Sequence, residues 1–169
     1  MKINKNSGIT LIALMVTVIV LLIIAGITVY NGTDVIKRGK LEELRTNMLL
    51  IEAKAKEYVE EANFKMGPSP DDAKKEEVRN EIYVEKAKLQ KATDTGINVP
   101  SAIPVQECYN ITQEAFKEWG LDKIELEENE YYLIKFDDQN ATVEIYNTLG
   151  FDDNGTIKYS LTDIDQIEE

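Results

Sequence analysis

The residues of this chain that could bind a metal ion lie in two short segments near its C-terminus. Carboxylate and amide oxygens are the ligands that Ca²⁺ prefers, so these residues are candidates for a calcium site. The EF-hand pattern is absent, because no Gly at the sixth position is followed by Glu at the twelfth. Since Asp and Asn are also ordinary turn formers, we favour turns here and expect no bound metal. The calcium candidates are Asp137, Asp138, Asp152, Asp153 and Asn154.

Catalytic chemistry is limited by a single cysteine, Cys108, and by the absence of histidine. Without histidine the chain has neither a His-containing catalytic triad nor a His-ligated metal site. One thiol cannot form an intramolecular disulfide, and we expect Cys108 to be a buried structural thiol. Nothing places the adjacent carboxylates Glu127 and Glu128 across a cleft, so glycosidase chemistry has no support. We therefore expect no enzymatic activity and no cofactor.

Charge is distributed unevenly along the chain. The 169 residues carry a formal net charge of −12, and Lys2 and Lys5 are the only charges before Asp34, so residues 31–169 carry −14. An acidic surface repels phosphates, which argues against direct nucleic-acid binding. A local basic cluster that suits lipid head groups follows the apolar run near the N-terminus. It consists of Lys37, Arg38 and Lys40.

The apolar run itself predicts a membrane helix. It covers the 21 residues 9–29, among which there is no charged residue and no proline. As a helix rising about 1.5 Å per residue, it would span roughly 32 Å, close to the hydrocarbon thickness of a bilayer. A secretory signal peptide has a shorter apolar region, followed by a small-residue cleavage site that is not evident here. We therefore expect a hydrophobic helix over residues 9–30 that is retained in the mature protein.

The run is preceded by a short polar leader, residues 1–8, which contains two lysines and ends in Gly8. This junction, with the sequence Gly-Ile-Thr-Leu-Ile-Ala, resembles the class III signal of type IV prepilins and pseudopilins, as in pilin-like proteins of low-GC Gram-positive bacteria. The resemblance implies that a prepilin peptidase cleaves between Gly8 and Ile9 and N-methylates Ile9. It also implies that helix 9–30 spans the membrane and then forms a filament core. Ala13 stands where the family usually has Glu, whose costly buried carboxylate pairs with the N-terminal amine of a neighbouring subunit.

The same resemblance implies an orientation in the membrane. The peptidase cuts on the cytoplasmic side, so the N-terminus would lie inside and the acidic head outside. The subunit would then reside in the cytoplasmic membrane before assembly, and in a cell-surface or periplasm-like filament afterwards. The positive-inside count does not support this orientation, because it sets Lys2 and Lys5 against four basic residues beyond the run. These four are Lys37, Arg38, Lys40 and Arg45.

An amphipathic continuation of the helix is predicted over residues 31–66. Its apolar residues recur with alternating spacings of three and four, which places them on one face, and Leu49, Leu50 and Val59 broaden that face. The breadth favours packing on a globular head, with a coiled-coil stalk as the competing interpretation. Gly32 and Gly39 weaken the helix, and we hypothesise that the segment from Asn31 to Gly39 unwinds in an assembled filament. The stripe consists of Leu41, Leu44, Met48, Ile51, Ala55, Tyr58 and Ala62.

The head, residues 67–169, is expected to combine a variable insert with a C-terminal antiparallel sheet over residues 128–161. The insert, 67–107, should begin with a charged helix that has Ser69 as its N-cap and reaches about Ala92. A loop containing Gly and Pro should complete the insert.

Three runs rich in aromatic and β-branched residues, joined by short turns, predict an antiparallel meander. A short helix, Gln113–Trp119, with Thr112 as its N-cap and Gly120 at its end, precedes them. Residues 142–164 also resemble the C-terminal part of the same Gram-positive pilin-like proteins. The expected fold is therefore α+β: a long N-terminal helix packed on a small three- to four-stranded antiparallel sheet. The strands are expected at Glu130–Phe136, Thr142–Asn147 and Thr156–Ser160.

Together these features predict a structural subunit, namely a pilin, minor pilin or pseudopilin of a type IV pilus-like or type II secretion-like filament. Its partners would be other copies or sister pilins, bound through the N-terminal helix, with the prepilin peptidase, the membrane assembly platform and the lipid bilayer. The alternative is a single-span, membrane-anchored extracellular binding module that does not polymerise. The first residue of the mature chain separates the two hypotheses: methylated Ile9 for the subunit and intact Met1 for the anchored module.

Overall fold

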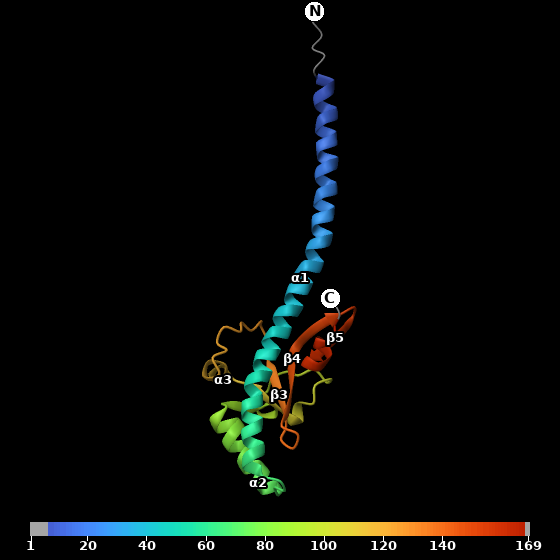
Figure 1. The fold of residues 1–169 in the computed structure, drawn as a ribbon. Helices are drawn as coiled ribbons and strands as arrows, with labels where there is room; N and C mark the ends of the chain where they lie inside the picture. The colour runs from blue at the N-terminus through green and yellow to red at the C-terminus, as the bar shows by residue number, and fades with distance from the viewer. Residues whose placement is uncertain (1–6, 168–169) are drawn as a thin grey trace, which may run out of the picture. The chain divides into compact units, whose positions relative to one another are not determined.

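The computed structural model describes residues 7–167, with side chains described at 14, 17–21 and 35–167. The chain divides into two compact units, residues 1–40 and 41–169. The helix α1, Ser7–Met66, contributes residues to both units. All the other elements belong to the second unit. There, α1 and α2 (Asp72–Arg79) can be followed beside the strands β3 (Tyr132–Asp137), β4 (Thr142–Asp153) and β5 (Thr156–Ser160) (Figure 1).

The elements after α1 alternate short helices with strands. In chain order they are α2 (Asp72–Arg79), the π-helical segment η1 (Asn80–Lys86), β1 (Leu89–Lys91), the 3₁₀ turns η2 (Ala92–Asp94) and η3 (Val105–Glu107), β2 (Cys108–Ile111), α3 (Gln113–Glu118), β3 (Tyr132–Asp137), β4 (Thr142–Asp153), β5 (Thr156–Ser160) and α4 (Leu161–Asp165).

The first unit is formed by the N-terminal part of α1. The helix is continuous through residues 26–40, so the glycines there do not break it in the single chain. The hypothesis that the segment from Asn31 to Gly39 unwinds concerns an assembled filament and stays a prediction. Among the described residues, no helix is both long and apolar enough to cross a membrane. Several predictions lie outside the described residues or side chains: those for leader residues 1–6, for most of the run 9–29, and for Gly8, Ile9 and Ala13.

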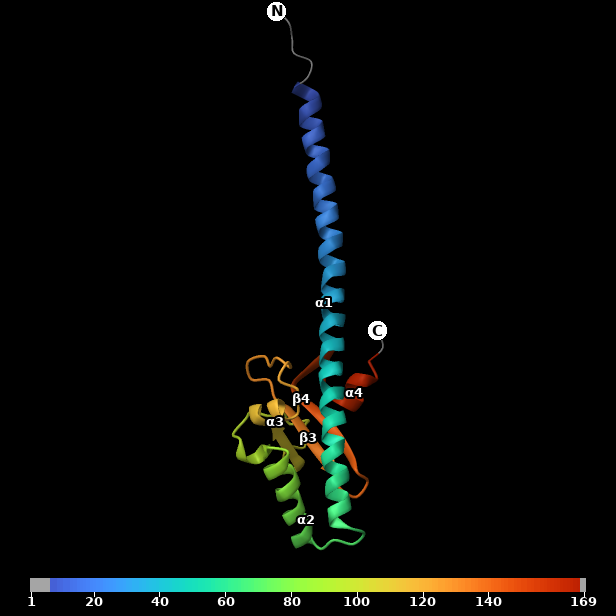
Figure 2. The same ribbon diagram turned by 60° about the vertical axis from the view of Figure 1, so that its left-hand side comes forward.

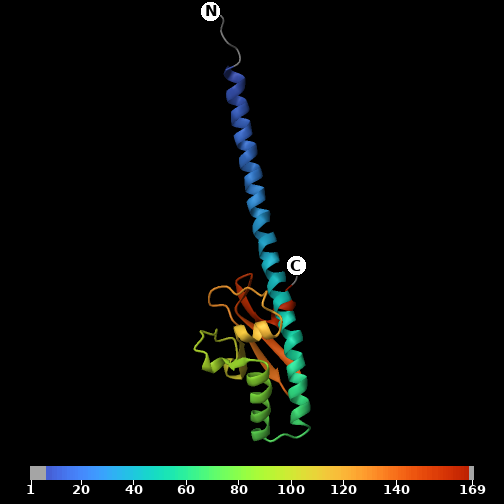
Figure 3. The same cartoon turned by 90° about the vertical axis from the view of Figure 1, so that its left-hand side faces the viewer.

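In the second unit, α1 packs its predicted apolar stripe against one face of the sheet (Figure 3). Because the sheet of the same chain covers this stripe, the stripe is not available to a partner helix, which argues against the coiled-coil stalk. Leu49 and Leu50 do not broaden the buried face as predicted, because they are 42% and 46% exposed. Each residue turns about 100° around a helix, and these two fall on the side away from the sheet. The buried residues are Leu41, Met48, Ile51, Ala55, Val59 and Ala62, with Leu44 and Tyr58 partly buried.

The sheet has five strands in the order β1-β2-β3-β4-β5, and each neighbouring pair is antiparallel. The prediction of three to four strands is therefore wrong, because it missed the short strands β1 and β2. The charged helix predicted to reach about Ala92 ends earlier, where Lys88 adopts a φ of 60° and the chain turns into β1. A left-handed conformation at a residue other than glycine has little sequence signal, and strands of 3 and 4 residues are too short to show alternation.

The three C-terminal strands lie close to their predicted positions. β5 has the predicted bounds, whereas β3 begins at Tyr132 and not at Glu130. β4 continues beyond Asn147 to Asp153 because a bulge carries the strand past an irregular stretch of the pairing with β5.

Gly150 lies at this bulge and has a φ of 63°, which favours glycine. A Cβ atom at this position would lie 2.5 Å from the carbonyl oxygen of Lys158 in β5. The two strands can therefore approach this closely only because residue 150 has no side chain.

Two helix N-caps were predicted, and one of them is confirmed. The hydroxyl of Thr112 accepts a hydrogen bond from the backbone N–H of Ala115 at 3.0 Å and so caps α3. The prediction of Ser69 as the cap of the next helix is wrong, because Asp71 caps α2 by accepting from the N–H of Lys74 at 2.7 Å. A carboxylate at this position also complements the positive end of the helix dipole.

The last helix, α4, is tied to α1 by Arg45. Its Nη2 atom donates to the carbonyl oxygens of Ile164 and Ile167, at 3.2 Å and 3.1 Å, and so satisfies backbone groups at the end of α4. Figure 2 shows α4 beside α1 and α2 alongside the last turns of α1. Ion pairs join α1 to η1 in the same region, between Lys65 and Glu81 and between Lys86 and Glu61.

The other face of the sheet is covered by the insert. Cys108 of β2 and Leu133 of β3 are buried there against Ala92 and Ile103 from the segment that follows β1. The sheet thus has a core on both faces, with α1 on one side and an irregular segment on the other.

Candidate functional site

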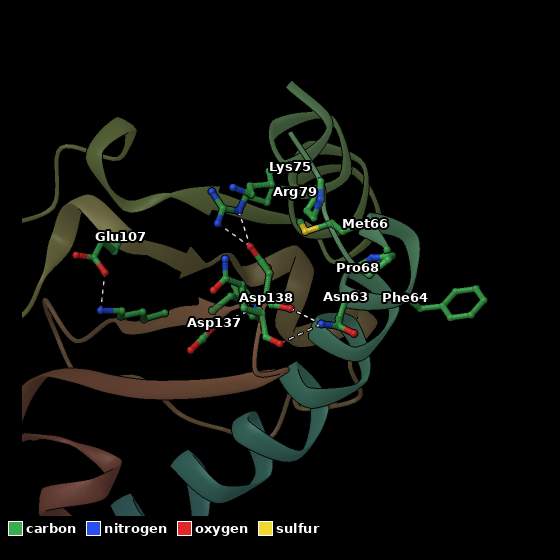
Figure 4. Close-up of a pocket in the computed structure, with 14 residues that line it drawn as sticks. Asn63, Phe64, Met66, Pro68, Lys75, Arg79, Glu107, Asp137 and Asp138 are labelled. Atoms are coloured by element: carbon green, nitrogen blue, oxygen red, sulfur yellow. Dashed lines mark hydrogen bonds and ion pairs between the residues drawn. The ribbon is translucent and has the colours of Figure 1, made fainter. Parts of the chain in front are cut away.

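Three elements of the second unit meet around the carboxylate of Asp138. Arg79 is the last residue of α2, Tyr83 follows four residues later in η1, and Asp138 lies in the turn between β3 and β4. The Nε and Nη2 atoms of Arg79 lie 2.7 Å and 2.6 Å from Oδ2 of Asp138. The hydroxyl of Tyr83 donates a hydrogen bond to Oδ1 of the same carboxylate. Figure 4 shows the Arg79–Asp138 pair at the wall of a cavity.

The β3–β4 turn is fixed by hydrogen bonds on both sides of Asp138. The Asp137 carboxylate accepts from the N–H groups of Gln139 and Asn140, at 3.0 Å and 3.1 Å, and from the side-chain amide of Asn140 at 2.7 Å. Asn63, near the end of α1, donates from Nδ2 to the carbonyl oxygen of Asp138 at 2.5 Å. These bonds hold the turn against α1 while the Asp138 side chain reaches Arg79 and Tyr83.

Burial sets the electrostatics of this cluster. Asp138 is 6% exposed, whereas the Arg79 side chain is 38% exposed. Burial and the hydrogen bond to Asp138 raise the pKa of Tyr83 well above its ordinary value, so its hydroxyl remains a donor. Burial alone would lower the pKa of Arg79, but its hydrogen bond to Asp138 and the charge of that carboxylate outweigh burial and raise it. The cluster is therefore a charged pair supported by a neutral phenol.

Aromatic rings pack directly behind the pair. The rings of Tyr83 and Phe136 are stacked, with centroids 3.9 Å apart and planes inclined by 4°. Tyr109 meets both rings edge-on, with centroid distances of 5.4 Å and 5.8 Å. This packing shields one side of the Asp138 carboxylate and fixes the position of the Tyr83 hydroxyl.

The cavity beside the cluster has a volume of about 1000 Å³ and lies between the end of α1, α2 and the β3–β4 turn (Figure 4). Its basic lining residues are each paired with a carboxylate. Lys75 lies 3.1 Å from Asp72, Lys135 lies 2.5 Å from Glu107, and Arg79 binds Asp138. Two of these pairs, Lys135 with Glu107 and Arg79 with Asp138, join the insert to the sheet, whereas Lys75 and Asp72 both lie in α2.

The structure does not bring the five calcium candidates together. Asp137 is the last residue of β3 and Asp138 follows it in the β3–β4 turn. Asp152 and Asp153 are the last residues of β4 and Asn154 follows them in the β4–β5 turn, at the opposite end of β4. Asp138 is bound to Arg79, and the Asp152 carboxylate accepts from the N–H of Gly155 at 2.7 Å. Within the described part of the chain, no group of three or more His, Cys, Asp or Glu side chains is placed to hold a metal ion.

Cys108 and the acidic dipeptide occupy separate parts of the second unit. Cys108 is 3% exposed, and burial raises the pKa of its thiol to about 12. Such a thiol carries little thiolate at neutral pH and is a poor nucleophile. Glu127 and Glu128 are exposed in the segment between α3 and β3.

Comparison of the chain with protein-family models, with curated proteins and with solved structures found no match.

The cluster of Arg79, Tyr83 and Asp138 was not predicted from the sequence. The spacing of Arg79 and Tyr83 would have placed them on one helix face, but nothing local indicates that Asp138, 59 residues after Arg79, is their partner.

Proposed function

We propose that this chain is a structural subunit of a type IV pilus-like or type II secretion-like filament. The subunit would be a pilin, a minor pilin or a pseudopilin, made with a leader that a prepilin peptidase removes after Gly8. N-methylation of Ile9 would follow. The proposal rests first on the junction between the polar leader and the uncharged run of residues 9–29.

The structural observation that supports the proposal is the packing of α1 in the second unit. The segment 41–66 buries a continuous apolar stripe on an antiparallel sheet, with Met48, Ile51 and Ala55 fully buried. Such packing anchors one end of a helix in a folded head and leaves the preceding residues to serve another role. A helix that links a head to an uncharged run is what a filament subunit requires.

The candidate site agrees with a structural role. The ion pair of Arg79 and Asp138 joins the insert to the sheet, and the basic residues around the cavity are already paired. A head that is stiff at this junction can carry force or contacts between subunits without performing chemistry. We therefore propose no reaction for this chain.

N-terminal mass spectrometry tests the proposal. The full chain, made in cells that contain a prepilin peptidase, should begin at a methylated Ile9. Gly8→Val should block this processing because a branched side chain replaces the glycine before the scissile bond. Asn6→Val, a change to the same residue type two positions upstream, should leave processing intact.

An unprocessed wild-type chain that keeps Met1 in those cells would contradict the filament proposal. That result would favour the single-span, membrane-anchored binding module. Export of a chain that lacks residues 9–29 would contradict both functions, because each requires the hydrophobic helix to be retained.

A further inference from the structure

The second unit has another cavity, which shares no lining residue with the cavity beside Asp138. Its volume is about 660 Å³, within the range of small-molecule sites, about 300–1,000 Å³. On one side it is lined by residues of the segment 95–100, which follows η2 in the insert. On the other side it is lined by Asn129, Tyr131, Thr148 and Leu149. We call it the amide cavity, because an asparagine lies on each side.

The lining of the amide cavity contains no charged residue. This is unusual for the second unit, because residues 41–169 contain 14 Lys or Arg and 30 Asp or Glu, about a third of the total. A charged ligand would lose hydration in the cavity without meeting an opposite charge. The lining therefore favours an uncharged ligand.

Unused hydrogen-bonding groups lie on both sides of the cavity. Asn98 and Asn129 are exposed, and neither side-chain amide forms a hydrogen bond to another residue that the structure describes. The hydroxyl of Tyr131 likewise has no partner within the described part of the chain. Amides and phenols both donate and accept hydrogen bonds. A ligand rich in hydroxyl groups, which also donate and accept, matches this set.

Apolar surface lies beside these polar groups. Ile97, Pro100 and Leu149 line the same cavity, and Tyr131 adds an aromatic ring with an apolar body. A sugar ring presents C–H groups on its faces and hydroxyls around its rim, so it can pack on such surface while its hydroxyls bond to amides. A purely apolar ligand would instead cover the amides without satisfying them.

Hydrogen bonds fix both sides of the cavity before any ligand binds. The backbone N–H of Tyr131 donates to Oγ1 of Thr148 at 2.9 Å, and the N–H of Thr148 donates to the carbonyl oxygen of Tyr131 at 3.0 Å. Thr148 is 5% exposed, so Tyr131 is held by a buried residue. On the insert side, the hydroxyl of Thr95 donates to the carbonyl oxygen of the buried Ala92 at 2.7 Å. Binding therefore costs little ordering of the chain.

We propose that the amide cavity binds a short, uncharged oligosaccharide. One sugar ring packs on Tyr131 and Leu149, and its hydroxyls form hydrogen bonds with the side-chain amides of Asn98 and Asn129. The binding is non-covalent and involves no reaction. This inference goes beyond the proposed filament function, because it concerns a ligand of the head and does not depend on polymerisation.

Saturation-transfer NMR on the full chain, in a detergent without a sugar head group, tests the site. The probes are the neutral disaccharides lactose, maltose, cellobiose and N,N′-diacetylchitobiose at millimolar concentration. At least one should bind, with a Kd that changes little between low and high salt because no charge takes part. Failure of all four to bind, or a Kd that depends steeply on salt, would overturn the inference.

A matched pair of asparagine variants locates the binding. Asn129→Gly removes one amide, and glycine readily adopts the φ of 63° at this position. It should weaken binding by about two- to tenfold, as expected for the loss of one hydrogen bond. The control is Asn154→Gly, because Asn154 is exposed, has a φ of 52° and lies outside the cavity. An equal Kd in the two variants would show that the disaccharide binds elsewhere and that the inference is wrong.

Variants of Tyr131 test the role of the ring. Tyr131→Leu removes the ring and the hydroxyl but leaves the backbone bonds to Thr148 available, and it should weaken binding by about tenfold. Tyr131→Phe keeps the ring and should weaken binding less. Circular dichroism checks that the head of each variant remains folded. Wild-type affinity in a folded Tyr131→Leu variant would contradict the proposed site.

The outcomes separate this inference from the proposed function. Disaccharide binding by a wild-type chain that is not processed at Gly8 would remove the filament function and leave the saccharide site intact. A methylated Ile9 in a chain that binds none of the four disaccharides would do the reverse.

Discussion

Arg79 at the end of α2 places its Nε atom 2.7 Å from Oδ2 of Asp138 in the β3–β4 turn. This bond connects the insert to the sheet across 59 residues of sequence. It is supported by the Tyr83 hydroxyl, which donates to the other oxygen of the same carboxylate. The insert is therefore not a loop without contacts to the sheet, because its helix α2 is bound through Arg79 to the buried carboxylate of Asp138.

Replacement of Asp138 by alanine should destabilise the head. The change leaves the Tyr83 hydroxyl and the Arg79 guanidinium without their acceptor, which should cost about 1–3 kcal/mol in the free energy of unfolding. Urea unfolding followed by circular dichroism measures this loss. The matched control is Glu76→Ala, which removes an exposed carboxylate 2.6 Å from Lys91 and should cost less than about 1 kcal/mol. Equal losses in the two variants would show that the buried carboxylate has no special role.

Replacement of Gly150 by alanine should also destabilise the head, for a steric reason. The new Cβ would meet the carbonyl oxygen of Lys158 at 2.5 Å, so β4 and β5 would have to separate at the bulge. We expect a loss of about 1–3 kcal/mol in the free energy of unfolding. Gly96→Ala is the control, since Gly96 has a similar φ of 68° but no atom within 4 Å of its added Cβ. Thermal unfolding should show a larger drop in Tm for the Gly150 variant, and the opposite order would refute the crowding argument.

Cys108 should make the head less stable at alkaline pH. Burial raises the pKa of its thiol from 9.0 to about 12, so above pH 9 the unfolded chain loses this proton while the folded chain keeps it. Stability from this group is present below pH 9 and is lost progressively as the pH rises toward 12, because the unfolded state then binds fewer protons. Buried tyrosines such as Tyr132, whose pKa is also raised by burial, add to the alkaline loss.

The variant Cys108→Ala isolates the contribution of the thiol. The free energy of unfolding of wild type and variant should be measured by urea titration at several pH values between 8 and 11. The wild type should lose more stability than the variant over this interval, whatever their difference at pH 8. Parallel curves for the two proteins would show that Cys108 titrates in the folded state as it does in the unfolded state.

The sequence by itself determined the elements that are specified by residues close to one another in the chain. The alternating spacing of Leu41, Met48 and Ile51 predicted the helix face that is buried, since a helix repeats every 3.6 residues whatever lies beside it. Thr112 was identified as a cap because a capping hydroxyl and the amide it binds are only three residues apart. The strand β5 was bounded correctly by its turn and its β-branched and aromatic residues.

Only the tertiary structure decided the features that depend on distant partners. Leu49 and Leu50 belong to an apolar run, yet the direction of the sheet leaves them exposed. The strand β1 exists because β2 offers it a hydrogen-bonding edge, and its three residues have no pattern of their own. In the sequence, Asp138 cannot be told from an ordinary turn carboxylate. It becomes the acceptor for Arg79 only because the fold brings together two residues that are 59 positions apart. Helix periodicity can be recognised from neighbouring residues alone. The contacts of Leu49, Leu50, β1 and Asp138 depend instead on the free energy of the whole packed head.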